Sequence, residues 1–302
     1  MRFGLIMYAT DYTIDPVSLG RAAEERGFES LFFPEHTHIP VASKRPGTIG
    51  PDKDSLDGYA HAYDPFVALA AVAATTTNLK IGTGVCLVVQ RDPITTAKEV
   101  ASIDQLSGGR FLFGVGAGWN AAEMANHGTD PAQRMAILAE RVHAMRRIWT
   151  NDQPSYHGKY VDFAPIWSWP KPVTKPHPPI LVGGNGSNVE DRVLDFGDEW
   201  LPQRVTLANV SEFGRRAAAL QRRAGDIGRG PIPITLFAAQ PDPATIEAYA
   251  DVGITRCLFV LPDAGPEIVL PLLDRLAKVV SETSVAGPVV HSPGPIQSHP
   301  TS

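Results

Sequence analysis

This 302-residue chain has only two cysteines, no long apolar run and no excess of basic residues. Cys86 and Cys257 both lie in apolar, strand-like runs, which excludes a disulfide scaffold and predicts buried free thiols in a reducing cytoplasm. No apolar run approaches the roughly 20 residues of a membrane span. The N-terminal MRFGLIMYAT is too short for a signal peptide. We therefore expect a cytoplasmic protein with no membrane contact.

The charge balance argues against a nucleic-acid partner. The formal net charge is -5, from 27 Lys and Arg against 32 Asp and Glu, and no basic run stands out. Hydrophobic residues make up 43% of the chain, which is enough for a large core. These values are ordinary for a soluble globular protein with a large core.

The stretch from Leu79 to Asn120 shows how the chain is organised. It reads LKIGTGVCLVV, then QRDPITTAKEVASIDQLSGG, then RFLFGVGAGWN. Two apolar runs flank a helical segment that begins at Asp92-Pro93, and neither run alternates cleanly between polar and apolar residues. The pattern predicts two buried strands joined by a helix. The second strand ends in glycines, where backbone can approach a ligand closely.

Similar apolar runs, separated by helical segments, recur along the chain. The predicted strands cover residues 2–8, 28–33, 79–89, 110–116, 179–183, 199–202, 232–238 and 255–261. Eight strands that alternate with helices predict an α/β fold, a (β/α)8 TIM barrel. A doubly wound open sheet is the alternative, but no glycine turn follows the first strand, as that fold would require.

Two insertions rich in proline interrupt the barrel pattern. One follows the second strand, at Ile39–His61, and the other precedes the fifth strand, at Asn151–Pro179. The second contains YHGKYVDF, which predicts a small hairpin around His157-Gly158. We expect one barrel domain over residues 1–283. Residues 284–302 are rich in Pro, Ser, Gly and His and predict a disordered tail.

In such a barrel the functional residues lie at the carboxyl ends of the strands. Two of these ends are rich in glycine: Gly116-Ala117-Gly118 before Trp119, and Gly183-Gly184-Asn185-Gly186-Ser187 at the start of a helix. Backbone N–H groups at a helix start bind anions. A single glycine turn is usually only a tight turn. Two of them in one ring favour a phosphate-bearing cofactor.

The segment Glu35-His36-Thr37-His38 allows two kinds of chemistry. His36 and His38 could be ligands of a metal-dependent hydrolase, which needs further ligands from later strand ends, and only Asp263 is suitably placed. Alternatively, His36 is an acid/base beside Glu35 that faces a cofactor. For His38 we favour a structural hydrogen bond to a neighbouring loop. We therefore predict His36 and Glu35 as catalytic residues and no metal site.

Three segments carry a resemblance to a known family. They are FFPEHTHIP, IGTGVCLVVQRDPITTAKEVASIDQLSGGRFLFGVGAGWN and PPILVGGNGS. The chain resembles the bacterial luciferase-like monooxygenase superfamily, and more closely its actinobacterial deazaflavin-dependent oxidoreductases, which use coenzyme F420. The similarity spans roughly Arg2 to Val280.

The resemblance implies a flavin or deazaflavin across the strand ends, hydride transfer at its ring, and a non-proline cis peptide at Gly84-Val85. It implies that coenzyme F420, or FMN in the alternative, is bound by Tyr8, Gly84, Val85, Gly116, Ala117, Gly118, Trp119, Gly183, Gly184, Asn185, Gly186 and Ser187. We expect a small organic substrate and a homodimer that works with an F420-reducing or flavin-reducing partner enzyme. An FMN-dependent monooxygenase and a metal-dependent TIM-barrel hydrolase are the alternative functions.

One position departs from the family pattern. Relatives that oxidise a sugar phosphate carry a Glu just after the glycine turn of strand four, where this chain has Trp119. A proton-donating carboxylate is missing at that point, which argues against a sugar-phosphate substrate. Trp119, Trp167 and Trp169 are candidates for lining an apolar pocket, with core or lid packing as the alternative for the last two.

Overall fold

The computed structural model describes residues 1–43 and 56–283. Residues 44–55 of the predicted first insertion lie outside the described residues, and so does the predicted tail over 284–302.

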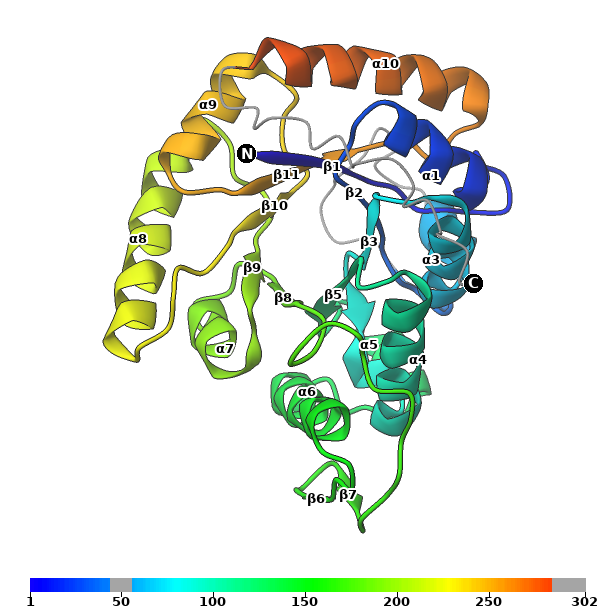
Figure 1. Cartoon of the computed structure of the whole chain (residues 1–302), viewed down its shortest axis with the longest axis vertical. Coiled ribbons are helices and arrows are strands. Elements are labelled where there is room, and N and C mark those ends of the chain that lie inside the picture. Colours follow the sequence, from blue (N-terminus) through cyan, green and yellow to red (C-terminus); the bar gives the residue numbers. More distant parts are fainter. Residues whose placement is uncertain (44–55, 284–302) are drawn as a thin grey trace, which may run out of the picture.

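One parallel sheet forms the centre of the molecule. Its strands are β1 Arg2–Ile6, β2 Ser30–Phe33, β3 Lys80–Thr83, β4 Cys86–Leu87, β5 Phe111–Gly116, β8 Ile180–Gly183, β9 Glu199–Leu201, β10 Thr235–Phe237 and β11 Arg256–Val260. The strand order is β10-β11-β1-β2-β3-β5-β8-β9, with the short β4 beside β5. Bridges from Trp200 to Ile234 and from Gln203 to Phe237 join the two ends of this order. The sheet is therefore a nearly closed eight-strand barrel, which confirms the predicted TIM barrel and shows that the open-sheet alternative is wrong (Figure 1).

The helices alternate with the strands and surround the barrel (Figure 1). They are α1 Pro16–Glu25, α2 Asp57–Ala60, α3 Pro65–Thr75, α4 Pro93–Leu106, α5 Ala121–Asn126, α6 Arg134–Thr150, α7 Val189–Phe196, α8 Val210–Asp226, α9 Pro243–Asp251 and α10 Pro266–Glu282. Two short helices, α2 and α5, were not expected from the sequence. The predicted third strand is also divided, because β3 and β4 are separate and a 3-10 turn, η1 Val88–Gln90, follows them.

An Asp-Pro pair starts four of these helices. Asp15, Asp64, Asp92 and Asp242 each occupy the N-cap, and each carboxylate accepts a hydrogen bond from a backbone N–H of the first turn. The proline that follows has a suitable φ and no N–H to leave unpaired. Each cap contributes about 1 kcal/mol. The starts of these helices are therefore set locally.

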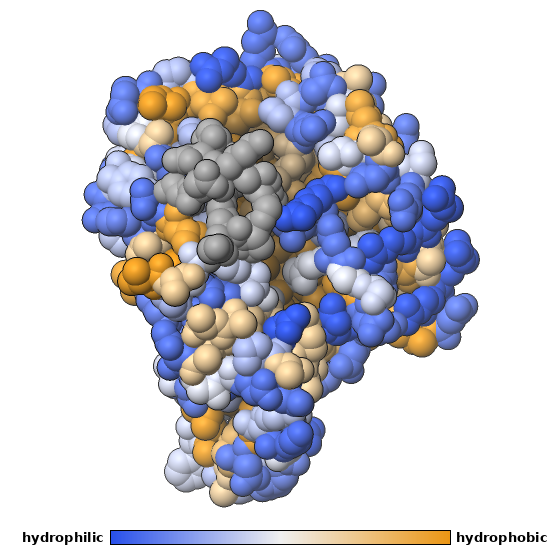
Figure 2. Space-filling view, turned by 180° about the vertical axis from the view of Figure 1, so that it is seen from behind, coloured by the Kyte–Doolittle hydropathy of each residue, from blue (hydrophilic) through white to orange (hydrophobic). Residues whose placement is uncertain are grey.

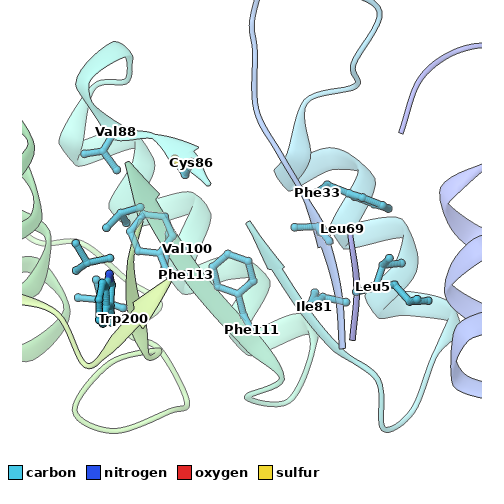
Figure 3. Packing of buried hydrophobic residues seen from close by; sticks show 14 of the residues in the cluster. Leu5, Phe33, Leu69, Ile81, Cys86, Val88, Val100, Phe111, Phe113 and Trp200 are labelled. Carbon is cyan, nitrogen blue, oxygen red and sulfur yellow. The ribbon is translucent and has the colours of Figure 1, made fainter. Parts of the chain in front are cut away.

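Strand β5 faces two different layers with alternate residues. Phe111 and Phe113 point out of the barrel, toward the helices (Figure 3). Their ring centroids lie 6.0 Å from Phe66 of α3 and 6.0 Å from Trp149 of α6, respectively. Leu112 faces inward and joins the barrel interior, a separate cluster formed by Ile6, Phe32, Leu112, Leu181, Leu201 and Leu258. Burial of each such side chain stabilises the fold by about 1.5–3 kcal/mol.

Arg256, the first residue of β11, is fully buried at the end of the barrel where the strands begin. Its Nε donates to Glu29 at 2.9 Å, and its Nη1 donates to Glu199 at 2.9 Å. Burial by itself would raise the pKa of Glu29, but the charge and hydrogen bonds of Arg256, with Lys80 nearby, lower this pKa to about 2. This end of the barrel is closed by an ion cluster.

The remaining elements agree largely with the sequence. β6 Tyr156–His157 pairs antiparallel with β7 Asp162–Phe163, which confirms the predicted hairpin. Cys86 and Cys257 are buried and free, as predicted. Within the part of the chain that the structure describes, no helix has the length and apolar character that crossing a membrane would need.

Candidate functional site

A cavity of about 1160 Å³ lies at the carboxyl ends of the barrel strands. Its wall contains every predicted site residue except Gly186 and Ser187. Figure 2 shows a hollow near the middle of this face, with hydrophobic side chains inside it and hydrophilic residues around it. This volume is slightly above the roughly 300–1,000 Å³ of ordinary small-molecule sites. It has room for a cofactor together with a substrate.

Val85 lies in the cavity wall between two glycines that end neighbouring strands. The Gly84–Val85 peptide is cis, as the resemblance implied. A Cβ built on Gly183, at the end of β8, would lie 2.9 Å from Val85 Cγ1, and Gly116, at the end of β5, is closer still. Side chains at these two positions would displace Val85. The glycines therefore set the shape of the cavity wall.

The glycine turn after β8 is held by its neighbours. Gly184 has a φ of +123°, which side-chain-bearing residues rarely adopt. Asn185 Oδ1 accepts from the Gln203 N–H at 3.0 Å, and Arg216 of α8 donates to the carbonyls of Asn185 and Gly186 at 3.2 and 3.3 Å. No side chain caps the start of α7. The turn is therefore rigid, and the first N–H groups of α7 have no side-chain acceptor within the described chain.

His36 is bonded to a carboxylate 87 residues away. His36 Nδ1 lies 2.8 Å from Oε2 of Glu123, which is fully buried, and Oε1 of Glu123 accepts from the Thr37 N–H at 3.3 Å. Because a carboxylate only accepts, Nδ1 carries the proton in this bond. Nε2 is then the nitrogen left for the cavity that His36 lines. Such a carboxylate fixes the orientation of the imidazole and stabilises its charged form.

Three aromatic side chains surround the His36 ring. The ring centroids of Tyr59, Trp119 and Tyr8 lie 4.9, 5.7 and 6.4 Å from that of His36. All three line the cavity, and Tyr59 comes from α2 inside the first insertion. The aromatic wall that was predicted around Trp119 is therefore present. The prediction that included Trp167 and Trp169 is wrong, because these side chains are exposed and do not line the cavity.

Glu35 is not the partner of His36. Its Oε2 accepts from the Leu87 N–H at 2.6 Å and its Oε1 accepts from Arg91 Nε at 2.5 Å. Both carboxylate oxygens therefore accept hydrogen bonds from residues in β4 or shortly after it. The sequence placed Glu35 and His36 in one catalytic pair because they are adjacent in the chain. The geometry instead favours a positioning role for Glu35. Its carboxylate connects the Arg91 side chain and the Leu87 backbone N–H to the segment that follows β2.

His38 makes the structural contacts that were favoured for it. Its Nδ1 lies 3.0 Å from Thr37 Oγ1, and its Nε2 lies 2.9 Å from Asn126 Nδ2. Over residues 1–43 and 56–283, no three His, Cys, Asp or Glu side chains converge to hold a metal ion. The two histidines of the hydrolase alternative thus have different partners and different surroundings.

Glu123 and Tyr59 were not predicted from the sequence as site residues. A signal for Glu123 exists, because Asn120 caps α5 through hydrogen bonds from the N–H groups of Ala122 and Glu123, both at 3.2 Å. An Asn with a Glu three residues later is a helix-start pattern. It would have placed this carboxylate on a helix directly after strand β5. Tyr59 has no comparable signal, since it lies in an irregular insertion.

Comparisons with known proteins identify relatives of this chain. An uncharacterized protein of Mycobacterium tuberculosis is 37% identical over 280 residues, which cover 92% of this chain and 98% of the relative. The F420-dependent hydroxymycolic acid dehydrogenase of the same organism is 26% identical, covering 78% of this chain and 62% of that protein. The FMNH2-dependent dimethylsulfone monooxygenase of Pseudomonas putida is 31% identical over 49% of this chain and 43% of its own length.

A solved structure has the same fold. The F420-dependent secondary alcohol dehydrogenase in complex with an F420-acetone adduct aligns with a TM-score of 0.70 at 18% identity, over 97% of this chain and all of the other. A family model described as luciferase-like monooxygenase matches residues 10–265. The chain therefore belongs to the luciferase-like monooxygenase family.

Proposed function

We propose that the protein is a coenzyme F420-dependent oxidoreductase, which transfers a hydride between the deazaflavin and a small organic substrate. The observation that carries the proposal is the His36–Glu123 pair, with Nδ1 and Oε2 2.8 Å apart at the wall of the barrel-end cavity. A hydride that leaves or enters an alcohol carbon is accompanied by a proton at oxygen. An imidazole held in one orientation is suited to that proton transfer.

The residues of the cavity fit a deazaflavin or a flavin. Val85, with Gly116 and Gly183 beside it, would form a wall of small side chains against a flat ring. Gly184, Asn185, Gly186 and Ser187 precede the start of α7, whose N–H groups would hold a phosphate. When bound, the cofactor supplies the carbon that accepts or donates the hydride. The protein contributes binding, orientation and control of the proton.

His36 is the residue that would exchange the proton. With Nδ1 donating to Glu123, the neutral ring presents Nε2 as an acceptor for a substrate hydroxyl. Glu123 is closed to solvent, and its second oxygen accepts from a backbone amide, which cannot carry the proton away. The proton must therefore leave His36 through Nε2, on the cavity side. Glu123 acts as a fixed counter-charge and not as a relay.

The comparisons support F420 but leave FMN as a second candidate. Relatives with F420-dependent and with FMNH2-dependent activities both match this chain. A paired imidazole at the cavity favours the F420 reaction, since substrate oxidation by hydride transfer needs a proton acceptor. We also propose that the enzyme works in the cytoplasm, where its two buried thiols stay reduced.

Titration with both cofactors tests the proposal. We expect the purified protein to bind F420, followed by its absorbance and fluorescence, and to bind FMN at least tenfold more weakly, in both oxidised and reduced states. Tighter binding of FMN would support the monooxygenase and overturn the F420 assignment.

A variant at His36 tests the catalytic role separately. A screen of secondary alcohols would supply a substrate that reduces bound F420 in a stopped-flow experiment. His36→Ala should lose about 10²–10⁴-fold in that rate, the usual contribution of acid–base catalysis, while F420 affinity stays within a few-fold of wild type. A rate within a few-fold of wild type would make His36 a structural residue only.

A further inference from the structure

A second cavity, of about 600 Å³, lies on the outside of the barrel against α6. It is lined by His143, Arg146, Arg147, Thr150, Tyr156, Pro176 and His177. The first four come from α6, Tyr156 comes from the β6–β7 hairpin, and the last two precede β8 (Figure 1). This cavity shares no lining residue with the one at the barrel end. It is a separate site.

The lining of this cavity is basic. It contains two arginines and two histidines and no carboxylate. Two acids next to the cavity face its histidines: Asp195 Oδ2 lies 3.1 Å from His143 Nε2, and Asp198 Oδ2 lies 3.8 Å from His177 Nδ1 and accepts from the Ile180 N–H at 2.9 Å. Neither the Arg146 nor the Arg147 side chain makes a hydrogen bond or ion pair within the described chain. Two guanidinium groups on adjacent residues thus have no direct carboxylate partner within the described chain.

The cavity also contains a buried histidine, His177, which the basic end of a helix alone would not provide. Only 5% of its surface is exposed, and its ring lies 5.8 Å from that of Trp149. Its Nδ1 lies 2.9 Å from the Pro178 carbonyl, which can only accept, so Nδ1 carries the proton there. Nε2 has no hydrogen-bond partner within the described chain, although His177 lines the cavity. Because this nitrogen is not closed off from solvent, it is accessible to a ligand in the cavity.

We propose that this cavity binds the phosphate group of a small organic phosphate ester. Arginine forks match phosphate oxygens in a bidentate way. His177 Nε2 can accept from a protonated phosphate oxygen or, once protonated, donate to it. The cavity is far larger than one phosphate ion, and the Tyr156 ring offers an apolar face to the rest of the ligand. The ligand is therefore a phosphate ester and not free phosphate.

Calorimetry on the full chain, with three probes of matched shape, tests this site. We expect phenyl phosphate to bind with one site per chain, inorganic phosphate to bind at least tenfold more weakly, and phenol not to bind. Raising the salt concentration should weaken the phenyl phosphate affinity, since the site is electrostatic and partly open. Equal binding of phenol would overturn the proposal.

Variants assign the binding to this cavity. Arg146→Gln/Arg147→Gln should lower the phenyl phosphate affinity at least tenfold, and His177→Gln should lower it by a smaller factor. The matched control is Arg215→Gln/Arg222→Gln, which removes the same charge from exposed arginines of α8 and should leave the affinity unchanged. If the control pair lost as much as the cavity pair, the binding would be non-specific.

A further variant separates this site from the barrel-end cavity. Gly186→Val should alter F420 binding and leave phenyl phosphate binding unchanged. Loss of phenyl phosphate binding in Gly186→Val would place the phosphate in the barrel-end cavity and overturn the second site. Arg146 and Arg147 lie at the surface, so their substitution should not prevent folding, which a thermal melt would check.

Discussion

The side chain of Val85 occupies the space into which a side chain on Gly116 would extend. A Cβ built on Gly116 would lie 2.5 Å from Val85 Cγ2, a separation that real Cβ atoms do not show. The two residues belong to β5 and to the segment between β3 and β4, which lie side by side in the barrel. One packing contact thus links the glycine turn of strand β5 to the wall of the barrel-end cavity.

Gly116→Ala should destabilise the protein through that contact. Overpacking of a tight site costs about 1–3 kcal/mol, and urea unfolding would measure it. Val85→Ala in the same chain should recover part of the loss, because it removes the atom that clashes. Gly225→Ala is the control, since nothing lies within 4 Å of its added Cβ in α8, and it should be neutral or slightly stabilising. Equal losses in Gly116→Ala with and without Val85→Ala would contradict the contact.

Glu123→Gln should separate the positioning of His36 from its charge. The amide can still accept from Nδ1, but the counter-charge that stabilises a protonated imidazole is lost. We expect the rate of F420 reduction to fall at least ~100-fold, with F420 affinity almost unchanged. Glu212→Gln, an exposed carboxylate on α8, is the control and should keep the wild-type rate. A Glu123→Gln enzyme with full activity would show that the pair is only structural.

Gly186→Val should weaken cofactor binding with little effect on folding. Only Arg192 Nη2, at 3.9 Å, lies near a Cβ at this position, so the folded chain can hold a side chain there. A branched side chain would nevertheless crowd the N–H groups before α7 that we assign to the phosphate. We expect the F420 dissociation constant to rise at least tenfold in a fluorescence titration. Gly230→Val, with nothing within 4 Å of its added Cβ, is the control, and equal affinities in both variants would remove the phosphate from this turn.

Acid should weaken the fold through Glu29. The lowered pKa of this carboxyl, about 2 in the folded protein against an ordinary value of 4.5, means that its contribution is complete above about pH 4.5. The contribution is lost as the pH falls from there toward 2, and it amounts to at most about 3 kcal/mol. Urea unfolding at pH 7, 4.5 and 3 would show this slope.

Glu29→Gln provides the comparison for that measurement. The variant cannot ionise at this position, so it should be less stable than wild type at pH 7, and the difference should shrink as the pH falls below 4.5. A difference that stayed constant from pH 7 to pH 3 would mean that Glu29 does not supply the acid dependence. Arg256 keeps its bond to Glu199 in this variant, so the barrel end should stay folded.

The sequence by itself determined the architecture and the glycine-rich strand ends. The eight barrel strands are apolar runs, and the Asp-Pro caps start their helices from adjacent residues, so both depend on local patterns. The turn after β8 was also predictable, since the conformation of Gly184 is one that few other residues adopt. These features depend on residues that are close in the sequence and not on which distant segments come into contact.

Tertiary structure alone decided which side chains are partners. Glu35 is adjacent to His36 in the chain but is bonded to Arg91, whereas Glu123, 87 residues away, is bonded to His36. Tyr59 reaches the same imidazole from an insertion without a regular pattern. The reason is that closure of the barrel brings the carboxyl ends of strands that are distant in the sequence close together. A carboxylate buried there is stable only if it accepts hydrogen bonds, and its donors come from these neighbouring strand ends.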